Sequence, residues 1–355
     1  MNYFFKTVLL FGICSCNNSK VSPTKTLDFS LDYLALGISF PPVADQEQRD
    51  FAAPLLSELN VGFIRIAEDW SFREPTQGSF NWLPLDDRIN WAFNNKLEVL
   101  LTIQSNGPNW ACTASQNDNS CVYANTTEFK NYVELLLQRY GGKIDKIQFG
   151  NEWQSDFWYI GTAQQFTEAS NVLYQAVQTY SPTTKMVLGG FTNASLRFLA
   201  GCNGKIGSFY DDEGILYDET YLAANCDGAE IQAVLTRINY VFDNALYDEV
   251  DIHLYDDVEN WDEYYLNFKT MTTKPIIVSE FGGPNMNYEI YSDIFQADRL
   301  YEYIKKIDSL QIREAYYFKL VEGTDNPAHS KSGLIQSTDL AKKESFDMFK
   351  NFTNQ

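Results

Sequence analysis

Apolar runs of strand length alternate with helix-like stretches along almost the whole chain, and this alternation is the strongest constraint on its fold. Most of the runs are near-continuous, which is typical of strands in a parallel sheet covered on both faces. Eight strands alternating with eight helices predict an α/β fold, the closed (β/α)8 or TIM barrel, in a single domain. The alternative is a doubly wound open sheet, but no glycine-rich phosphate loop follows any expected strand. The strands are expected at 34–40, 61–66, 98–104, 144–150, 184–190, 249–254, 275–280 and 313–320, and the helices near 47–59, 85–95, 127–140, 162–180, 229–246, 259–271, 292–310 and 339–352.

The composition suits a folded body and limits its partners. Of the 355 residues, 45% are apolar and 15% aromatic, so a large hydrophobic core is available. The formal net charge is −20, and no block rich in Lys and Arg occurs. Nucleic acids and anionic membrane surfaces attract clustered positive charge, so neither is an expected partner. A neutral substrate is the simplest expectation, and we expect the body, residues 29–355, to be a monomer.

The first residues, 1–15, are typical of a signal peptide. Lys6 precedes the apolar stretch 7–13, which is too short to be a stable membrane anchor. The tetrapeptide Ile-Cys-Ser-Cys that ends at Cys16 resembles a bacterial lipobox, in which a small residue precedes the cysteine to be acylated. We therefore expect an exported lipoprotein, held at the bacterial outer membrane by its lipid alone, with residues 16–28 as a flexible tether. The alternative is an ordinary secretory signal that is cleaved nearby.

Four further cysteines form two close pairs, each across a polar, loop-like stretch. Two local disulfides, Cys112–Cys121 and Cys202–Cys226, are the natural interpretation in an oxidising compartment. A metal site is the weaker alternative, because the spacings are not those of zinc sites. The segment 191–228 is too long for a simple connection, so we expect an excursion beside the active-site face of the barrel. We expect neither a metal nor an organic cofactor.

Two glutamates each end a short apolar run of strand length, Glu152 after 144–150 and Glu280 at the end of 275–280. In a (β/α)8 barrel the carboxyl ends of all strands open onto one face, where active sites lie. Glu is almost never buried without a partner, so packing alone does not explain either carboxylate. Two carboxyl groups at one cleft can cleave a glycosidic bond, one as proton donor and one as nucleophile. A capping or salt-bridge role for each glutamate is the alternative.

A series of motifs at successive strand ends resembles the large clan of retaining β-glycosidases on (β/α)8 barrels, in particular the cellulase-like family 5 and its relatives. The resemblance spans about residues 34–352, and the order of the motifs carries it, because each motif alone is weak. The motifs are 59–66 with Trp70 and 74–86, then 97–103 followed by Pro108-Asn109-Trp110, then Asn151-Glu152, His253-Leu254-Tyr255, Ser279-Glu280-Phe281-Gly282 and Ser332-Gly333-Leu334-Ile335.

The resemblance implies retaining hydrolysis of a β-linked polysaccharide or oligosaccharide, and we expect cleavage within the chain rather than at its end. It makes Glu152 the general acid/base and Glu280 the nucleophile that attacks the anomeric carbon. Arg65 is expected to stabilise the charge of Glu280, with a purely structural ion pair as the alternative. Tyr255 is expected to donate a hydrogen bond to Glu280.

Two further residues of the motifs are expected at the same site. Asn151 is expected to bind the sugar hydroxyl next to the reacting carbon. His253 is expected to line the floor, with a satisfied wall residue as the alternative. A different class of function stays open: a glycan-binding surface lipoprotein that has kept the barrel and lost turnover. An esterase is disfavoured because the chain lacks a GxSxG nucleophile elbow.

Aromatic residues just past strand ends are candidates for stacking on sugar rings, although an aromatic is more often part of the core. Many members of the clan place a tryptophan at the end of strand eight, but the stretch 316–320 contains none. Phe318 is expected to take that place, and Lys319 beside it would suit an anionic sugar. The other expected substrate-binding residues are Trp70, Trp110, Trp153 and Trp158.

Overall fold

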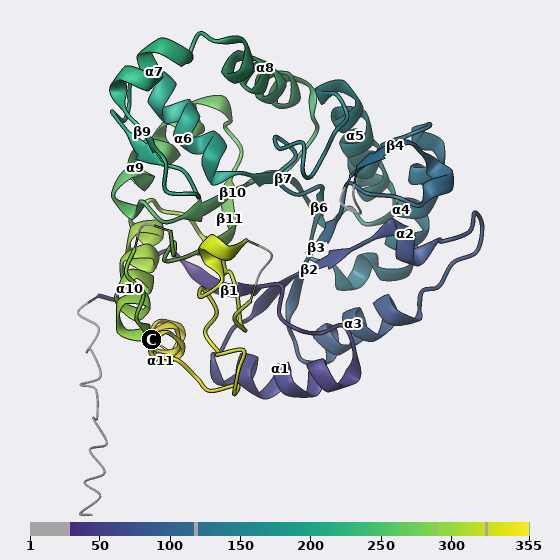
Figure 1. Cartoon of the computed structure of the whole chain (residues 1–355). Coiled ribbons are helices and arrows are strands. Elements are labelled where there is room, and N and C mark those ends of the chain that lie inside the picture. Colours follow the sequence, from purple (N-terminus) through teal and green to yellow (C-terminus); the bar gives the residue numbers. More distant parts are fainter. Residues whose placement is uncertain (1–28, 117–119, 288, 324–325, 355) are drawn as a thin grey trace, which may run out of the picture.

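The computed structural model describes residues 29–116, 120–287, 289–323 and 326–354, and in this part of the chain parallel strands form a closed barrel inside a ring of helices (Figure 1). The barrel closes because its first and last strands pair in parallel, with Ala35 opposite Glu314. The predicted (β/α)8 barrel is confirmed. Around the barrel the strands follow chain order: β1 (Ala35–Ser39), β2 (Phe63–Glu68), β3 (Glu98–Ile103), β6 (Lys146–Phe149), β7 (Lys185–Phe191), β10 (Glu249–Tyr255), β11 (Ile276–Gly282) and β12 (Glu314–Tyr317).

Several ring helices begin with a side chain that satisfies a first-turn backbone N–H group, as in the capping box of Thr162 and Gln165 at the start of α5. A helix occurs at each of the eight places where the sequence predicts one. In the described residues these helices are α1 (Gln46–Glu58), α3 (Leu83–Asn94), α4 (Thr126–Tyr140), α5 (Ala163–Tyr180), α8 (Ala229–Asn244), α9 (Trp261–Phe268), α10 (Asp293–Ser309) and α11 (Glu344–Thr353).

The long segment 191–228 differs in part from its predicted form. It begins with α6 (Asn193–Cys202), which packs against α9 and β10 and is therefore a member of the ring. Only the remainder stands out as an excursion: the hairpin of β8 (Phe209–Tyr210) and β9 (Leu216–Tyr217), followed by α7 (Glu219–Asn225). The sequence pattern does not separate this helix from β7, because the apolar residues of α6 follow almost directly on the apolar run of that strand.

The barrel interior is filled near the amino ends of the strands. Leu100, Val187, Ile277 and Tyr316 form a buried apolar cluster there. At the same end, Lys146 of β6 forms two ion pairs of 2.7 Å, with the first residues of β10 and β12. The interior is thus closed at one end, and the carboxyl ends of the strands form its open end, where the active sites of such barrels lie.

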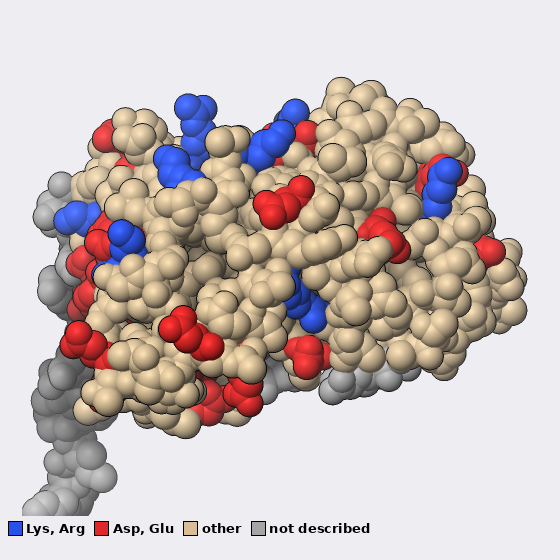
Figure 2. Space-filling model, turned by 90° about the horizontal axis from the view of Figure 1, so that it is seen from above, with Lys and Arg blue, Asp and Glu red and all other residues tan. Residues whose placement is uncertain are grey.

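On the face seen in Figure 2, Lys and Arg side chains are few and scattered, and Asp and Glu side chains gather along the left and lower edge. No helix of the described residues is both long and apolar enough to span a bilayer. The expected signal peptide 1–15, the acylated Cys16 and the tether 16–28 lie outside the described residues, so the expected lipid anchor and outer-membrane location stay predictions.

Candidate active site

Polar side chains from four strands meet at the carboxyl end of the barrel. Because the strands run in parallel, their carboxyl halves face the same rim. The sequence predictions placed all of these residues at strand ends, and the structure brings them together, although Arg65 is the third of the 6 residues of β2. They are Arg65 from β2, Asn151 and Glu152 after β6, His253 and Tyr255 from β10, and Glu280 from β11.

Glu280 is almost buried and accepts one hydrogen bond on each carboxylate oxygen. Arg65 Nη1 lies 2.5 Å from its Oε1, and the hydroxyl of Tyr255 donates to its Oε2 at 2.7 Å. Burial and the Glu280 charge raise the pKa of Tyr255 well above its ordinary value, so the hydroxyl keeps its proton. Two donors therefore hold the two oxygens of this carboxylate in a fixed orientation.

Arg65 is completely buried, and each nitrogen of its guanidinium group has a hydrogen-bond partner. Its Nε donates to Thr102 Oγ1 at 2.9 Å, and its Nη2 donates to Asn151 Oδ1 at 2.7 Å. The guanidinium also lies over the ring of Phe40, at 4.7 Å from the ring centroid. A planar group held on three sides cannot swing away from Glu280, so the ion pair has one fixed geometry.

Glu152 is the more exposed of the two glutamates, with 25% of its side chain accessible to solvent, against 9% for Glu280. One carboxylate oxygen lies 2.8 Å from His253 Nδ1, and the other accepts a hydrogen bond from the indole of Trp158 at 2.9 Å. Trp158 belongs to the loop between β6 and α5. An exposed carboxyl group with fixed oxygens is suited to exchange protons with a ligand.

The backbone around Glu152 is unusual. The φ of Glu152 is +44°, and the neighbouring Gly190 of β7 has a φ of +64°. A Cβ on Gly190 would lie 2.2 Å from the backbone N of Glu152, so only glycine lets β7 approach this closely. A residue other than Gly, Asn or Asp with positive φ is uncommon and concentrates at functional sites.

His253 joins the two glutamates through opposite sides of one buried ring. Its Nδ1 contacts Glu152, and its Nε2 lies 3.7 Å from Glu280 Oε1. Burial alone would lower the pKa of His253, but the charges of Glu280 and Asp251 raise it to about 10. The ring therefore carries a positive charge at neutral pH, and both of its nitrogens are donors.

Asp251 was missed by the sequence analysis. This fully buried carboxylate accepts from the backbone N of Ser279 at 2.8 Å and from its hydroxyl at 2.5 Å, and lies 3.5 Å from His253 Nε2. Burial would raise the pKa of Asp251, but the charge of His253 outweighs this and lowers it. A signal was present: Asp251 and His253 are two residues apart in one strand, so their side chains share a face.

Two predicted sugar platforms are wrong. Trp70 is completely buried and stacks on Tyr132, while its indole donates to Glu74 at 2.8 Å. Trp153 is 1% exposed and stacks on Phe166 of α5. Neither ring offers a face to a ligand, because both pack between barrel and helices.

Three other predicted aromatics keep part of their surface exposed. Trp158 lies next to Glu152, as described above. Phe318 packs edge-on against Phe40 and Tyr255, which places it beside Glu280 and its partners. Trp110 lies edge-on against Trp70 and donates to the backbone of Glu74, outside the pair of glutamates. A platform role therefore fits Trp158 and Phe318 better than Trp110.

Lys319 follows Phe318 at the end of β12, and the peptide bond between them is cis. Its side chain is partly exposed, and its Nζ lies 5.6 Å from the ring centroid of Phe318. The predicted cation is thus near the mouth of the barrel.

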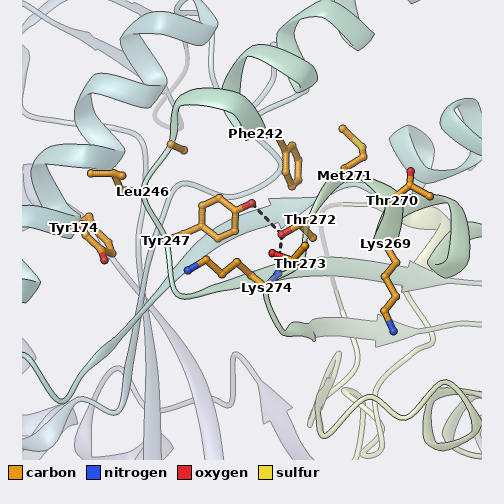
Figure 3. Close-up of a pocket in the computed structure, with 11 residues that line it drawn as sticks. Tyr174, Phe242, Leu246, Tyr247, Lys269, Thr270, Met271, Thr272, Thr273 and Lys274 are labelled. Carbon is orange, nitrogen blue, oxygen red and sulfur yellow. Dashed lines mark hydrogen bonds between the residues drawn. The ribbon is translucent and has the colours of Figure 1, made fainter.

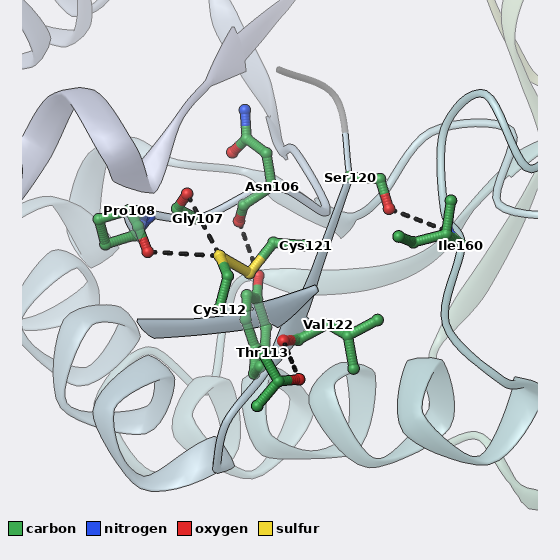
Figure 4. The surroundings of a disulfide bond; sticks show 10 residues. Asn106, Gly107, Pro108, Cys112, Thr113, Ser120, Cys121, Val122 and Ile160 are labelled. Atoms are coloured by element: carbon green, nitrogen blue, oxygen red, sulfur yellow. Dashed lines mark hydrogen bonds between the residues drawn. A yellow bond between two sulfur atoms is a disulfide. The ribbon is translucent and has the colours of Figure 1, made fainter. Parts of the chain in front are cut away.

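Both predicted disulfides are confirmed. Cys112–Cys121 joins β4 (Cys112–Gln116) to β5 (Ser120–Tyr123), and Cys202–Cys226 joins the ends of α6 and α7. Ser120 in the first hairpin accepts from the backbone N of Ile160 (Figure 4) at 2.9 Å. Ile160 lies in the same loop as Trp158, so this stapled hairpin supports the loop that carries the partner of Glu152.

A surface depression of about 450 Å³ lies elsewhere (Figure 3). Its walls include Tyr247, just before β10, and Thr272, just before β11, whose hydroxyls lie 3.1 Å apart. These positions are at the amino ends of the strands, so the depression is at the end of the barrel opposite the glutamates. In the part of the chain that the structure describes, no group of three or more His, Cys, Asp or Glu residues could hold a metal ion.

No protein-family model matches the chain. Among curated proteins, endo-1,4-beta-xylanase 1 of Arabidopsis thaliana is 27% identical to this chain over 112 residues, a stretch that covers 30% of the chain and 11% of that protein. The chain thus spans a small part of the length of this relative.

Solved structures with a similar fold include three glycoside hydrolases. A glucosidase from Croceicoccus marinus superposes with a TM-score of 0.65 at 14% identity, covering 92% of this chain and 68% of that one. A family 39 glycoside hydrolase from Bacteroides cellulosilyticus WH2 gives 0.62 at 15% identity, with 90% and 64% covered. A GH10 xylanase from Bispora sp. MEY-1 gives 0.58 at 18% identity, with 90% and 96% covered. The chain therefore has the barrel fold of these glycoside hydrolases.

Proposed function

We propose that this protein is a retaining β-glycoside hydrolase that uses Glu152 as acid/base and Glu280 as nucleophile. One observation carries the proposal: the two carboxylates contact opposite nitrogens of the single buried ring of His253. This arrangement supports one shared site at the carboxyl end of the barrel, and retention requires the two carboxyl groups to be about 5–5.5 Å apart. Similar folds in known glycoside hydrolases support it.

In the first step, a carboxylate oxygen of Glu280 forms a bond to the anomeric carbon, and the bond from that carbon to the leaving oxygen breaks. Glu152 gives its proton to the leaving oxygen, which departs as an alcohol. Arg65 and Tyr255 hold Glu280 in one orientation during the attack, because both donors are themselves buried.

In the second step, Glu152 is ionised and removes a proton from water. The water oxygen bonds to the anomeric carbon while the bond to Glu280 breaks, so Glu280 leaves as a carboxylate. Two inversions at one carbon give net retention. The donors on Glu280 help this step, since they stabilise the charge that returns to it.

Glu152 must be protonated before the first step. A quarter of its side chain is exposed, so the proton can come from solvent, while the Nδ1 of His253, 2.8 Å from the nearer oxygen, holds that oxygen in place. The indole of Trp158 holds the other oxygen and so fixes the direction in which the proton is presented.

The test is product analysis over a panel of β-linked polysaccharides and oligosaccharides, with neutral, uronic and sulfated members. The parent protein should release sugar of retained configuration, observed by proton NMR at early times. Glu280→Gln should remove measurable turnover, and Glu152→Gln should lower it by about 10²- to 10⁴-fold. Glu263→Gln, an exposed change of the same charge on α9, is the control and should behave as the parent.

Azide separates the two roles on the same panel. With Glu152→Ala, azide should attack the glycosyl-enzyme and give a β-glycosyl azide. With Glu280→Ala, azide should replace the nucleophile and give an α-glycosyl azide. The opposite assignment of products would reverse the roles of the two glutamates.

The panel also decides between classes of function. A protein that binds a glycan tightly while neither parent nor variants release sugar is a glycan-binding protein, and the proposal is then wrong. We further propose internal cleavage and, because Lys319 lies beside Phe318, a preference for anionic members of the panel. Release of only terminal sugars contradicts the first point, and equal turnover of charged and neutral glycans contradicts the second.

A further inference from the structure

A second cluster of buried charge lies behind Tyr255, and the proposed reaction does not use it. His329 ends a short 3-10 helix, η5 (Pro327–His329), in the connection between β12 and α11, and is 5% exposed. Its Nε2 lies 3.8 Å from a carboxylate oxygen of Asp212, and its Nδ1 lies 3.8 Å from one of Asp256. Asp212 belongs to the turn of the β8–β9 hairpin, and Asp256 follows β10. Three separate segments thus meet at one imidazole.

This cluster is charged but has few hydrogen bonds. Among the described residues, neither ring nitrogen of His329 and neither carboxylate oxygen of the fully buried Asp256 has a hydrogen-bond partner. Asp212 has a second partner, Arg197 of α6, at 3.0 Å. Buried ionisable groups are costly, and they persist where paired charges or function retain them.

The ring of His329 packs against the ring of Tyr255. Their centroids are 4.4 Å apart, and the two planes are inclined by 33°. Tyr255 is the residue whose hydroxyl donates to Glu280 Oε2 at 2.7 Å. A contiguous chain of contacts therefore runs from the excursion, through Asp212 and His329, to Tyr255 and the carboxylate.

We propose that His329 is a positioning residue, which holds Tyr255 in hydrogen-bonding contact with Glu280 and is itself held by Asp212 of the excursion. The inference rests on the proposed function, in which Glu280 is the nucleophile. A cation against an aromatic face is attracted to the ring and fixes its position, so a charged His329 does more than fill space.

The charges around His329 favour its charged form. Burial alone would lower the pKa of His329, but the carboxylates of Asp212 and Asp256 raise it above its ordinary value. Burial raises the pKa of Asp256 to about 7, against the charges of His329 and Arg197. The groups that face this cluster from the packed elements are Asp212, Asp256, Asp257, Arg197, Glu289, Tyr255 and Tyr303.

The proposal has a kinetic signature that a merely structural residue lacks. The hydrogen bond from Tyr255 stabilises Glu280 when it leaves the sugar as a carboxylate, so its loss slows the second step more than the first. When the second step limits the rate, kcat and KM fall together and kcat/KM changes little.

The experiment uses full-length protein and the substrate that the panel identifies. His329→Gln should lower kcat and KM together, by about 3- to 30-fold. Asp212→Asn, at the more accessible end of the chain of contacts, should act in the same direction. Glu213→Gln makes the same change of charge one residue along the same hairpin turn, on an exposed side chain, and should leave both constants as in the parent.

A crystal structure of His329→Gln gives a readout that does not depend on activity. The hydroxyl of Tyr255 should move out of hydrogen-bonding distance of Glu280. If His329→Gln does not fold, the kinetic constants and the crystal structure are measured on Asp212→Asn instead. Unchanged kcat and KM with the Tyr255–Glu280 contact intact would overturn the inference. If the parent cleaves no glycan, the proposed function fails, and the position of Tyr255 still decides the inference.

Discussion

Glu152 has a donor on each carboxylate oxygen, and these two donors differ in kind. His253 is charged and buried, whereas Trp158 is neutral and comes from a partly exposed loop. In the proposed reaction Glu152 is an acid in the first step and a base in the second. Both donors fix the direction of its oxygens, so each affects how the proton is presented to the leaving oxygen.

Trp158→Phe tests the role of the indole hydrogen bond to Glu152, because it removes this donor and keeps an aromatic ring. A hydrogen bond to a charged group contributes ~1.5–3 kcal/mol, so its loss should lower a rate constant by about 10- to 100-fold. We expect this loss in kcat/KM for natural glycans, whose leaving oxygen must be protonated in a fixed direction. Aryl glycosides with nitrophenolate leaving groups should lose little, because they depart without a proton. Equal losses on both substrates would contradict the assignment, and Trp91→Phe on α3 is the matched control.

For single residues, the position near the carboxyl end of a predicted strand indicated which side chains meet at the site. Arg65, His253 and Glu280 could be predicted because parallel strands end at one rim, whatever the details of packing. The burial of Trp70 and Trp153 could not be predicted, because the direction of a side chain just past a strand depends on the turn that follows. The backbone at Glu152 has a positive φ, and Trp153 then points into the helix layer.

The closure of the barrel depends on one helix end as well as on strand pairing. Asp308, in the last turn of α10, is 3% exposed and accepts hydrogen bonds from consecutive backbone N–H groups just before β1. The bonds to Tyr33 and Leu34 are 2.8 and 2.9 Å long. These contacts hold the entry of β1 next to the strand that it must pair with, β12.

Asp308→Ala leaves these backbone donors without their acceptor. The free energy of unfolding should fall by about 2–3 kcal/mol, the usual range for buried donors that lose a charged partner. Chemical denaturation followed by circular dichroism measures the change. Glu302→Ala, at an exposed position on the same helix, should change stability by less than about 0.5 kcal/mol. A similar effect of both substitutions would mean that Asp308 does not hold β1.

At the element scale, the eight strands and eight helices were predictable because their apolar patterns have the correct period and length. α6 was not, since its apolar residues follow directly on the apolar run of β7, and the β8–β9 hairpin was not, since strands of 2 residues carry no periodic signal. The hairpin is fixed by tertiary contacts instead: its turn is held by side chains of the β11–α10 loop, with Asn285 Nδ2 3.1 Å from the carbonyl of Asp212.

For the molecule as a whole, the buried histidines and carboxyl groups set how stability depends on pH. The pKa of His253 is raised from 6.5 to about 10, so its contribution is complete below pH 6.5 and is lost between about pH 6.5 and 10. The pKa of Asp256 is raised from 3.8 to about 7, so ionisation destabilises the fold as the pH rises through that range. The lowered pKa of Asp251 acts oppositely, because its contribution is lost as the pH falls below about 4.

Thermal stability should therefore be highest at about pH 4–5, just above the range in which the contribution of Asp251 is lost, and should fall steadily toward pH 10. The net charge of −20 acts in the same direction, since deprotonation adds to self-repulsion. Melting temperatures across this range, at constant ionic strength, measure the effect. His253→Asn should be less stable at pH 6 and should show a shallower decline above it. A melting temperature that rises from pH 6 to 9 would contradict this account.

The direction in which β1 runs has a consequence for the chain ahead of it. The described part begins at Phe29, whose ring packs edge-on against Phe352 of α11, and β1 then leads from the closed end of the barrel toward the glutamates. The chain ahead of Phe29 therefore joins the barrel at the pole opposite the two glutamates, so a partner or surface held by that end would not cover the site.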